Sequence, residues 1–435
     1  MRALYWFRED LRLADNPALA AMAEVADEAV FVFVIPTNDN WSLGPNRMGP
    51  HRRRFMLESL IDLDASLRAH GNRLMVLEGS PDEVVEAWAR QYKCAAVYAQ
   101  KTHTSEEIHA TRQVAKNCEV REVEGTTLIH PEDLPFEISD LPEIFTRFRK
   151  KVEKGGLPIR AACEVPEIPP PPPDLPNSSG LGMESYDAPS LLEEAMTFGG
   201  GAEAGWQRLR YYFWETGALS EYKQTRNGML GYDYSSKFSP WLAWGCLSPR
   251  SIYEAIREYE LDRGANESTY WLIFELLWRD YFRFIAMQQG DRIWHKTGLK
   301  SEPRNPVTHH PLQWKSWCTG TTRSPFVNAN MHELRLTGFM SNRGRQNVAS
   351  YAIHDMGLDW RACAAWFEYW LIDFDPCSNT GNWLYVAGIG NDPRPQRKFD
   401  VDWQAERYDA DGAFQNFWNR IGTAMPCDPE TIHLP

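Results

Sequence analysis

Hydrophobic and polar residues follow two different rhythms along the chain, and the change of rhythm predicts two domains. Up to about residue 130, short β-branched and aromatic runs alternate with stretches of helical periodicity. The short runs predict five strands, at residues 4–7, 30–35, 74–77, 95–99 and 118–123. Helices are predicted between them, starting at Asn16-Pro17, at residue 51, at Ser80-Pro81 and at Thr104-Ser105. This βαβ order indicates an α/β domain over residues 1–130, with a five-stranded parallel sheet of the doubly wound type.

Residues 131–205 follow neither rhythm. They contain a proline run at 169–173 and a glycine cluster at 199–201, which regular sheet or helix cannot contain throughout. We therefore predict a Pro/Gly-rich surface connector, extended along its prolines and disordered in part.

Helical periodicity with aromatic faces dominates from residue 206 to the end. The predicted helices are 206–214, 248–259, 268–289, 327–337, 342–355 and 359–371, and strand signals almost vanish. An all-helical domain over residues 206–435, following the α/β domain, is the predicted architecture.

Composition narrows the functional classes. The net charge of -13 favours solubility and opposes non-specific adhesion to nucleic acid, although a local basic groove stays compatible with it. The eight cysteines form no C-x-x-C pair, and no apolar stretch is long enough to span a membrane, so we expect a cytoplasmic protein. No G-x-G-x-x-G follows the first strand, and no His/Cys cluster has metal-ligand spacing, which argues against an NAD site and a metal site.

Tryptophan is concentrated in the second half of the chain. Of 18 tryptophans, only Trp6, Trp41 and Trp88 precede residue 200, and the other fifteen follow it. Trp360, Trp366, Trp370 and Trp383 lie close together in the sequence. A large aromatic core is the simple explanation, and chemistry that uses indoles is the alternative.

Three groups of polar residues are candidates for a site. Helical spacing puts Glu275, Trp278, Arg279 and Phe282 on one face, where a buried Glu-Arg pair is the structural alternative. A second face carries Asn342, Arg345 and Gln346, whose amides and guanidinium suit a planar polar ligand unless they simply face solvent. Asp373 and Asp375 precede a proline, so they are expected near a turn rather than on one helix face.

Residues 235–239 form the remaining candidate. Three serines and Lys237 stand just before a helix-like stretch, a composition that suits a diphosphate, although a helix cap is a sufficient explanation.

Together these segments resemble the photolyase and cryptochrome family, most closely its cryptochrome DASH branch. The resemblance covers essentially the whole chain. It is most specific in four runs, GYDYSSKFSPWLAWGCLSPR, YWLIFELLWRDYFRF, MHELRLTGFMSNRGRQNVAS and CSNTGNWLYVAGIGNDPR. It implies a U-shaped FAD in the helical domain.

The resemblance also implies roles for individual residues. Glu275 matches the acid that binds the base edges of a DNA lesion, and Asn342 matches the amide between flavin and lesion. Arg345 and Asp373 match the pair that flanks the isoalloxazine, Asp375 matches the acid at its polar edge, and Asn379 matches the residue facing N5. The other cofactor-binding residues implied are Tyr222, Ser235, Ser236, Lys237, Phe238, Ser239 and Arg279.

The reaction implied is light-driven repair of cyclobutane pyrimidine dimers by an electron from excited, reduced FAD. Trp278 matches one aromatic wall of the lesion site. Tyr385 and Gln346 stand where photolyases of duplex DNA carry tryptophan and methionine, choices of the DASH branch, whose members favour single-stranded DNA. The alternatives are a blue-light receptor that uses the same FAD without repair and a redox-inert relative. The family resemblance also implies a monomer.

Several positions depart from the family pattern. Trp383 and Trp360 match the inner members of the tryptophan relay, but the outer position is Val307, so Trp314 or a tyrosine is an alternative donor. Thr102 replaces the glutamate that usually holds the antenna folate, which weakens the expectation of methenyltetrahydrofolate. Asn328 and Asp400 replace the usual Asp and Asn, with no functional explanation from the sequence.

Overall fold

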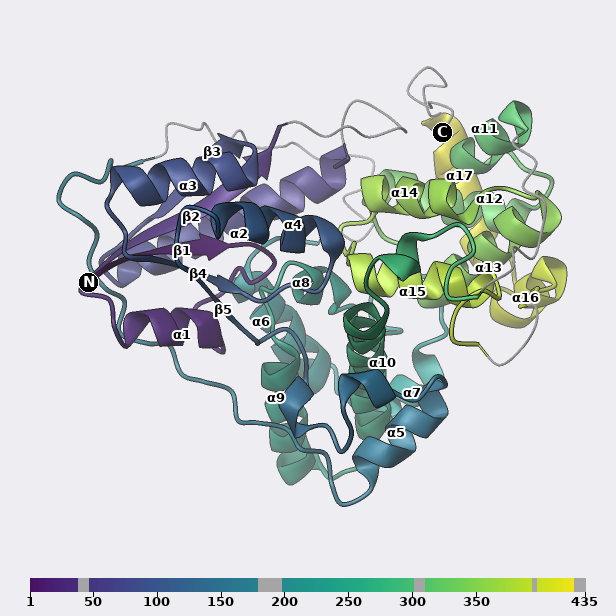
Figure 1. The fold of residues 1–435 in the computed structure, drawn as a ribbon. Helices are drawn as coiled ribbons and strands as arrows, with labels where there is room; N and C mark the ends of the chain where they lie inside the picture. The colour runs from purple at the N-terminus through teal and green to yellow at the C-terminus, as the bar shows by residue number, and fades with distance from the viewer. Residues whose placement is uncertain (38–46, 179–197, 301–309, 393–396, 426–435) are drawn as a thin grey trace.

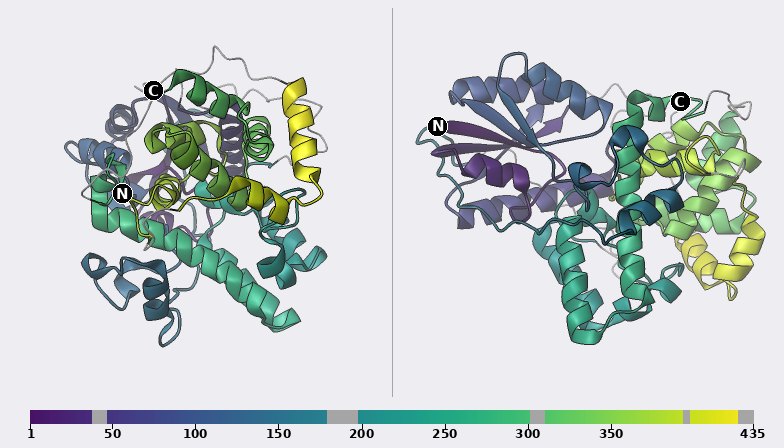
Figure 2. Two further views of the ribbon diagram at one scale, coloured as in Figure 1. Left: turned by 90° about the vertical axis from the view of Figure 1, so that its right-hand side faces the viewer. Right: turned by 60° about the horizontal axis from the view of Figure 1, so that its bottom comes forward.

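A computed structural model describes residues 1–37, 47–178, 198–300, 310–392 and 397–425. The α/β domain and the helical domain lie side by side (Figure 1, Figure 2). No helix of the described ranges is both long and apolar enough to cross a membrane.

The first domain is a five-stranded parallel sheet, as predicted. Its order is β3-β2-β1-β4-β5, which puts β1 in the centre. The strands are β1 Arg2–Phe7, β2 Glu28–Pro36, β3 Leu74–Gly79, β4 Ala96–Gln100 and β5 Val120–Val123.

Helices cover both faces of this sheet because successive side chains of a strand point to opposite sides. Tyr5 and Phe7 pack with α1 (Pro17–Ala23) and α2 (Pro50–Ala69). Leu4 and Trp6 lie on the opposite face of the sheet and pack against α3 and α4. The bounds of these two helices are Pro81–Gln91 for α3 and Ser105–Val114 for α4. The predicted doubly wound arrangement is confirmed.

The second domain is helical, and each of its predicted helices is present. The long helix α10 (Glu267–Gln289) starts with a capping box at Asn266 and Thr269 and runs through the domain (Figure 1). The other helices are α6 Ala202–Arg210, α7 Tyr222–Thr225, α8 Ser239–Ala243, α9 Pro249–Arg263, α11 Pro311–Thr319, α12 Pro325–Thr337, α13 Asn342–Ser350, α14 Trp360–Trp370, α15 Pro376–Val386, α16 Val401–Tyr408 and α17 Ala413–Ala424. Short π-helical turns, Tyr211–Glu215 and Tyr351–Asp355, extend α6 and α13 to their predicted ends.

The connector is more ordered than the sequence suggested. Short 3-10 turns, Pro131–Asp133 and Ile138–Asp140, precede a helix, α5 (Phe145–Glu153). Phe145 and Phe148 of α5 are buried against α10, so this part of the connector belongs to the core rather than the surface. The sequence did not predict α5 because its apolar face has only three residues, Phe145, Phe148 and Val152, within a proline-rich segment. The disorder proposed for the connector concerns in part residues 179–197, which lie outside the described residues.

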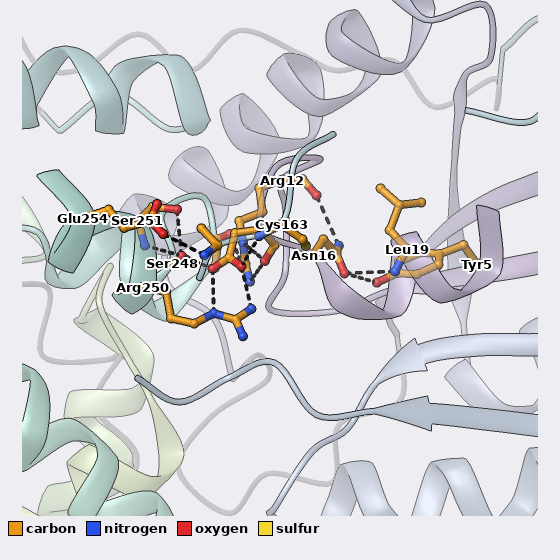
Figure 3. Close-up of polar contacts among 12 residues, drawn as sticks. Tyr5, Arg12, Asn16, Leu19, Cys163, Ser248, Arg250, Ser251 and Glu254 are labelled. Atoms are coloured by element: carbon orange, nitrogen blue, oxygen red, sulfur yellow. Dashed lines mark hydrogen bonds and ion pairs between the residues drawn. The ribbon is translucent and has the colours of Figure 1, made fainter. Parts of the chain in front are cut away.

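Buried polar contacts join the two domains. The Asp15 carboxylate of the first domain accepts hydrogen bonds from Arg250 and Ser248 of the second, and from the backbone N–H of Cys163. Figure 3 shows Arg250, Ser248 and Cys163 converging there beside Arg12. Breaking such a buried ion pair by removing one partner costs about 3–5 kcal/mol, so this contact fixes how the domains meet.

A glycine lets the backbones of the two domains approach closely. Gly245 has φ +67°, and a Cβ there would lie 2.1 Å from the carbonyl oxygen of Glu9. Its own carbonyl accepts a 2.8 Å hydrogen bond from Arg12. No other residue type fits this position without moving one domain against the other.

We predict that Gly245→Ala lowers the free energy of unfolding by about 3 kcal/mol or more, from left-handed strain plus overpacking. Gly217→Ala is the matched control, because Gly217 has φ +66° with open space around it, so only about 1 kcal/mol of strain is expected. Thermal unfolding measures both variants. Equal destabilisation would show that the close approach of the domains does not matter.

Candidate functional site

Two acids in the turn between α14 and α15 form the centre of the candidate site. Asp375 is the N-cap of α15 and accepts a 2.6 Å hydrogen bond from the N–H of Ser378. The turn sends the two carboxylates to different arginines. Asp373 pairs with Arg345 of α13 at 2.7 Å, and Asp375 pairs with Arg283 of α10. The predicted turn is present, and Arg345 and Asp373, which the resemblance assigns to the flavin ring, form an ion pair with each other.

The charges around Asp375 keep it ionised. Burial opposes its ionisation, but Arg283 and Arg279 outweigh burial and hold its pKa below the ordinary value. Burial and the neighbouring Arg283 lower the pKa of Arg279 to about 9, which still leaves it cationic at neutral pH. Arg279 donates to the carbonyls of Thr126 and Leu242 and lies at the domain boundary. It does not pair with Glu275.

Glu275 instead pairs with Arg226, which follows α7. The structural alternative of a Glu-Arg pair is therefore present, with a partner the sequence did not suggest. Both side chains stay partly exposed, at 28% for Glu275 and 21% for Arg226. Burial raises the pKa of Glu275 and Arg226 opposes the shift. Tyr222 lies close enough for Glu275 to raise its pKa further, after burial. An acid with an exposed edge beside a cation can bind a polar ligand.

The serine-rich segment 235–239 is a loop organised by a buried arginine. Arg208 of α6 donates to the carbonyls of Tyr232, Ser235 and Ser236 and pairs with Asp233 at 2.7 Å. The sequence analysis missed Arg208, because only the fold brings α6 under the loop.

The loop presents donors that match an anionic group. Lys237 is buried with φ +56° and donates to the carbonyl of Gly231. The hydroxyls of Ser235, Ser236 and Ser239 make no hydrogen bond to any residue that the structure describes. Phe238 anchors the loop in the core against Tyr212 and Phe213. Three hydroxyls and one ammonium suit a diphosphate.

Several buried acceptors beside this loop have no partner among the described residues. Glu333 of α12 is fully buried, yet neither carboxylate oxygen has a hydrogen-bond partner, and neither does Asp373 Oδ1 or the Tyr234 hydroxyl. Burial raises the pKa of Glu333 to about 8, against the opposing charges of Lys237 and Arg345. Unsatisfied buried groups of this kind point to a polar ligand with its own donors. A dinucleotide with ribityl hydroxyls and ring N–H groups fits this requirement.

Helix α15 carries two further predicted residues on one face, four residues apart. Asn379 donates to the carbonyl of Ala364 at 3.1 Å, and Trp383 is buried one turn later. Trp360 is also buried, and its Nε1 donates to the carbonyl of Lys296. No aromatic ring contact joins Trp360 to Trp383 within the described ranges. The relay position Val307 lies outside the described residues.

The predicted lesion walls come together at one end of the site. Trp278 stacks on Phe145 with ring centroids 3.7 Å apart and meets Tyr385 edge-on at 6.0 Å. Gln346 accepts a hydrogen bond from Arg343. Asn342, the first residue of α13, is exposed.

Arginines surround these walls, and the sequence analysis did not identify them. The guanidinium of Arg343 lies over the ring of Tyr408 and donates to Asn227, and Arg397 lies 4.4 Å over the ring of Tyr385. Burial lowers the pKa of Arg343, and the nearby charges of Arg226, Arg397 and Arg407 add to the effect. Arg226, Arg343, Arg397 and Arg407 thus lie within electrostatic reach of one another, and Arg397 contacts the Tyr385 wall, although the net charge of the chain is -13. We call them the arginine cluster.

A small cavity of about 50 Å³ lies between the two domains. It is lined by Arg8, Glu107 and Arg283, and by Thr102, which accepts a 3.1 Å hydrogen bond from Arg8. Thr102 is the position where the antenna glutamate was expected. Its neutral hydroxyl is hydrogen-bonded to Arg8.

Asn328 and Asp400 have local structural roles. Asn328 accepts from the N–H and hydroxyl of Thr322 and donates to its carbonyl, which closes the turn before α12. Asp400 is the N-cap of α16. At both positions where the chain departs from the family pattern, the side chain still forms hydrogen bonds that cap a helix or close a turn. In the described parts of the chain, no group of three or more His, Cys, Asp or Glu could hold a metal ion.

Comparison with known proteins gives the same family for both domains. Residues 3–173 match the DNA photolyase family, and residues 271–433 match the FAD binding domain of DNA photolyase. The Cryptochrome DASH of Synechocystis sp. is 44% identical over 450 residues, which cover 99% of this chain and 90% of that protein. The Cryptochrome DASH of Gloeobacter violaceus is 46% identical over 444 residues, which cover 99% and 88%. The crystal structure of a Synechocystis cryptochrome superposes with a TM-score of 0.91 at 42% identity and covers 100% of this chain and 91% of that one.

We predict that FAD affinity decreases as the pH rises from about 6 to about 9. Burial lowers the pKa of Lys237 to about 7, and that of Glu333 is about 8. Rising pH therefore first removes the positive charge of Lys237 and then adds the negative charge of Glu333 beside the loop. Both changes weaken binding of the FAD diphosphate. Quenching of FAD fluorescence by flavin-stripped protein measures the affinity.

Two variants separate the contributions to this pH dependence. Glu333→Gln keeps the shape of the side chain and should remove the decrease in FAD affinity that comes from ionisation of Glu333. Lys237→Met should remove the decrease that comes from deprotonation of Lys237, and it should weaken FAD binding at neutral pH. A wild-type affinity that stays constant across this pH range would contradict the assignment of the loop to the diphosphate.

Proposed function

Since this chain belongs to the cryptochrome DASH branch of the photolyase and cryptochrome family, we propose that it repairs cyclobutane pyrimidine dimers with light, preferentially in single-stranded DNA. The family implies interaction with DNA, and FAD is the cofactor of its helical domain. FAD, when bound, supplies light absorption and one-electron transfer.

One observation carries the proposal: the partly exposed Glu275 carboxylate lies beside Arg226 on the helix that also carries the Trp278 wall. An acceptor and an aromatic face at this spacing suit a flipped pyrimidine pair, whose ring N–H groups donate and whose faces are apolar. A protein that only stored flavin would have no use for such an arrangement.

The arginine cluster supports nucleic acid as the partner. Phosphate contacts supply most of the affinity in protein–DNA binding, and a local cluster achieves this even when the net charge is negative. Arg343 and Arg397 each stack on a tyrosine, which holds the guanidinium plane at the surface of the site.

The small wall at Tyr385 supports the preference for single strands. A phenol covers less of a base than an indole, so it compensates less for unstacking a duplex. A single strand requires less unpairing before a dimer can enter the site. The guanidinium of Arg397 lies over the ring of Tyr385 and places a positive charge beside this wall.

The residues of the chain would divide the work as follows. Lys237 and the loop serines hold the diphosphate, and Arg345 with Asp373 and Asp375 orient the flavin ring. Asn342 and Glu275 bind the dimer at its polar edge.

Water-poor surroundings keep these interactions strong, because most of the residues involved are buried or half-buried. Six of the described cysteines are thiols, which supports a reducing, cytoplasmic setting: Cys94, Cys118, Cys163, Cys246, Cys363 and Cys377. We propose a monomer on family resemblance.

We predict light-dependent repair of a thymine-dimer oligonucleotide by chemically reduced protein, faster on the single strand than on the duplex, with none in the dark. Glu275→Ala should slow repair by at least about tenfold, which corresponds to ~1.4 kcal/mol of lost stabilisation. Chromatography of the repaired oligonucleotide measures both rates.

The other outcomes are equally informative. Absence of repair on either substrate, despite bound and reduced FAD, would contradict the proposal and favour a blue-light receptor. Equal rates on both substrates would leave the repair activity and remove the argument from Tyr385. Undiminished repair by Glu275→Ala would show that its role is wrongly assigned.

The arginine cluster gives a separate prediction. Arg343→Gln should weaken binding of single-stranded DNA and reduce the slope of log K against log salt by about 0.7, one phosphate contact. Arg112→Gln is the control, because Arg112 is exposed on α4 of the other domain. Fluorescence anisotropy across a salt series measures both slopes, and identical slopes would exclude Arg343 from the interface.

A further inference from the structure

The described part of the structure contains a continuous path of aromatic rings that leaves Trp383 in a direction other than Trp360. Trp383 lies 6.4 Å from Trp317 of α11, measured between ring centroids, and Trp317 stacks on Trp314 at 5.7 Å. Trp314 meets Trp366 of α14 edge-on at 6.1 Å. Trp366 stacks on Tyr369 at 6.1 Å, with an angle of 23° between the planes.

The inner rings of this path are shielded from water. Trp383, Trp317, Trp314 and Trp366 are each 4% exposed or less. Phe367 packs against both Trp383 and Trp317 and closes the gap beside them. Electron transfer between aromatic rings falls steeply with separation, so rings in van der Waals contact favour hopping along the chain.

Among the rings that the structure describes, the last one on this path is Tyr369, which can release a proton. Tyr369 is partly exposed, unlike the four indoles before it. Oxidation makes a phenol strongly acidic, so a tyrosine at the surface loses its proton to solvent and traps the hole there. Trp370 is a second ring at this end, with its centroid 5.9 Å from that of Trp366, and it packs edge-on against Tyr369. We assign proton release to the phenol of Tyr369.

We propose that Trp317, Trp314, Trp366 and Tyr369 carry electrons from the protein surface to Trp383 during photoreduction of the flavin. Trp383 gives one electron to light-excited FAD, and each ring then reduces the one before it, until Tyr369 has lost one electron and its phenolic proton. A soluble thiol reductant returns an electron and a proton to Tyr369. The proposal rests on bound FAD and not on dimer repair.

The sequence offers a reason for this route. Val307 cannot donate an electron, and Trp360 makes no ring contact with another described residue, so it is poorly placed to pass a hole outward. The four rings of the proposed path come from two helices, α11 and α14, and Trp383 adds a third, α15, packed against them. A simple core would also bury these rings, but it would not require an unbroken series that ends in a partly exposed phenol.

The test measures photoreduction of oxidised, FAD-loaded protein under blue light with a thiol present. Trp366→Phe should slow it by at least about tenfold, because a phenyl ring is much harder to oxidise than an indole. Tyr369→Phe should abolish the tyrosyl radical signal that electron paramagnetic resonance detects in wild-type protein after a flash. Trp418→Phe, a buried tryptophan of α17 away from the path, is the matched control.

The outcomes are distinguishable from those of the proposed function. Flavin content and thermal unfolding establish that each variant is folded, and Tyr369→Phe changes a partly exposed side chain and keeps the test available if Trp366→Phe does not fold. Repair by chemically reduced Trp366→Phe should equal that of wild type if repair occurs at all. Unchanged photoreduction in Trp366→Phe, loss of photoreduction only in Trp360→Phe, or an unchanged radical in Tyr369→Phe would each overturn the proposal.

Discussion

The pairing of two acids, Asp373 and Asp375, with arginines from two different helices is the interaction on which the site depends. Burying carboxylates inside a helical domain is costly unless cations pair with them, and Arg345 of α13 pairs with Asp373 while Arg283 of α10 pairs with Asp375. The pairs therefore fix the turn between α14 and α15 relative to two other helices. Since Asp375 also caps α15, the same contacts set where that helix begins.

The start of α15 in turn determines which functions share the helix. Asn379 and Trp383 lie one turn apart on the face toward the core, and Tyr385 lies about 200° away from Trp383 around the helix axis. One helix thus contributes to cofactor orientation, electron supply and DNA contact. A shift of one residue in the cap would rotate all three residues by about 100°.

Local patterns predicted the strands, the main helices and the turn at Asp373 because periodicity and proline act within a few residues. Pairings between distant segments could not be read in the same way. Glu275 meets Arg226 rather than Arg279, and Arg208 supports the serine loop from α6. Helix α5 was missed because its apolar stripe is short and lies in proline-rich sequence.

Helix α15 contributes one ring to each of two separate groups of aromatic residues: Trp383 to the electron-transfer path and Tyr385 to the lesion walls. Rings that pass electrons must stay dry and in contact, whereas rings that receive a base must be reachable from solvent, and a single cluster cannot satisfy both conditions. Trp383 is buried among α11 and α14, and Tyr385 is partly exposed beside Trp278 and Arg397. DNA at Tyr385 would therefore contact a different side of α15 from the rings of the proposed path.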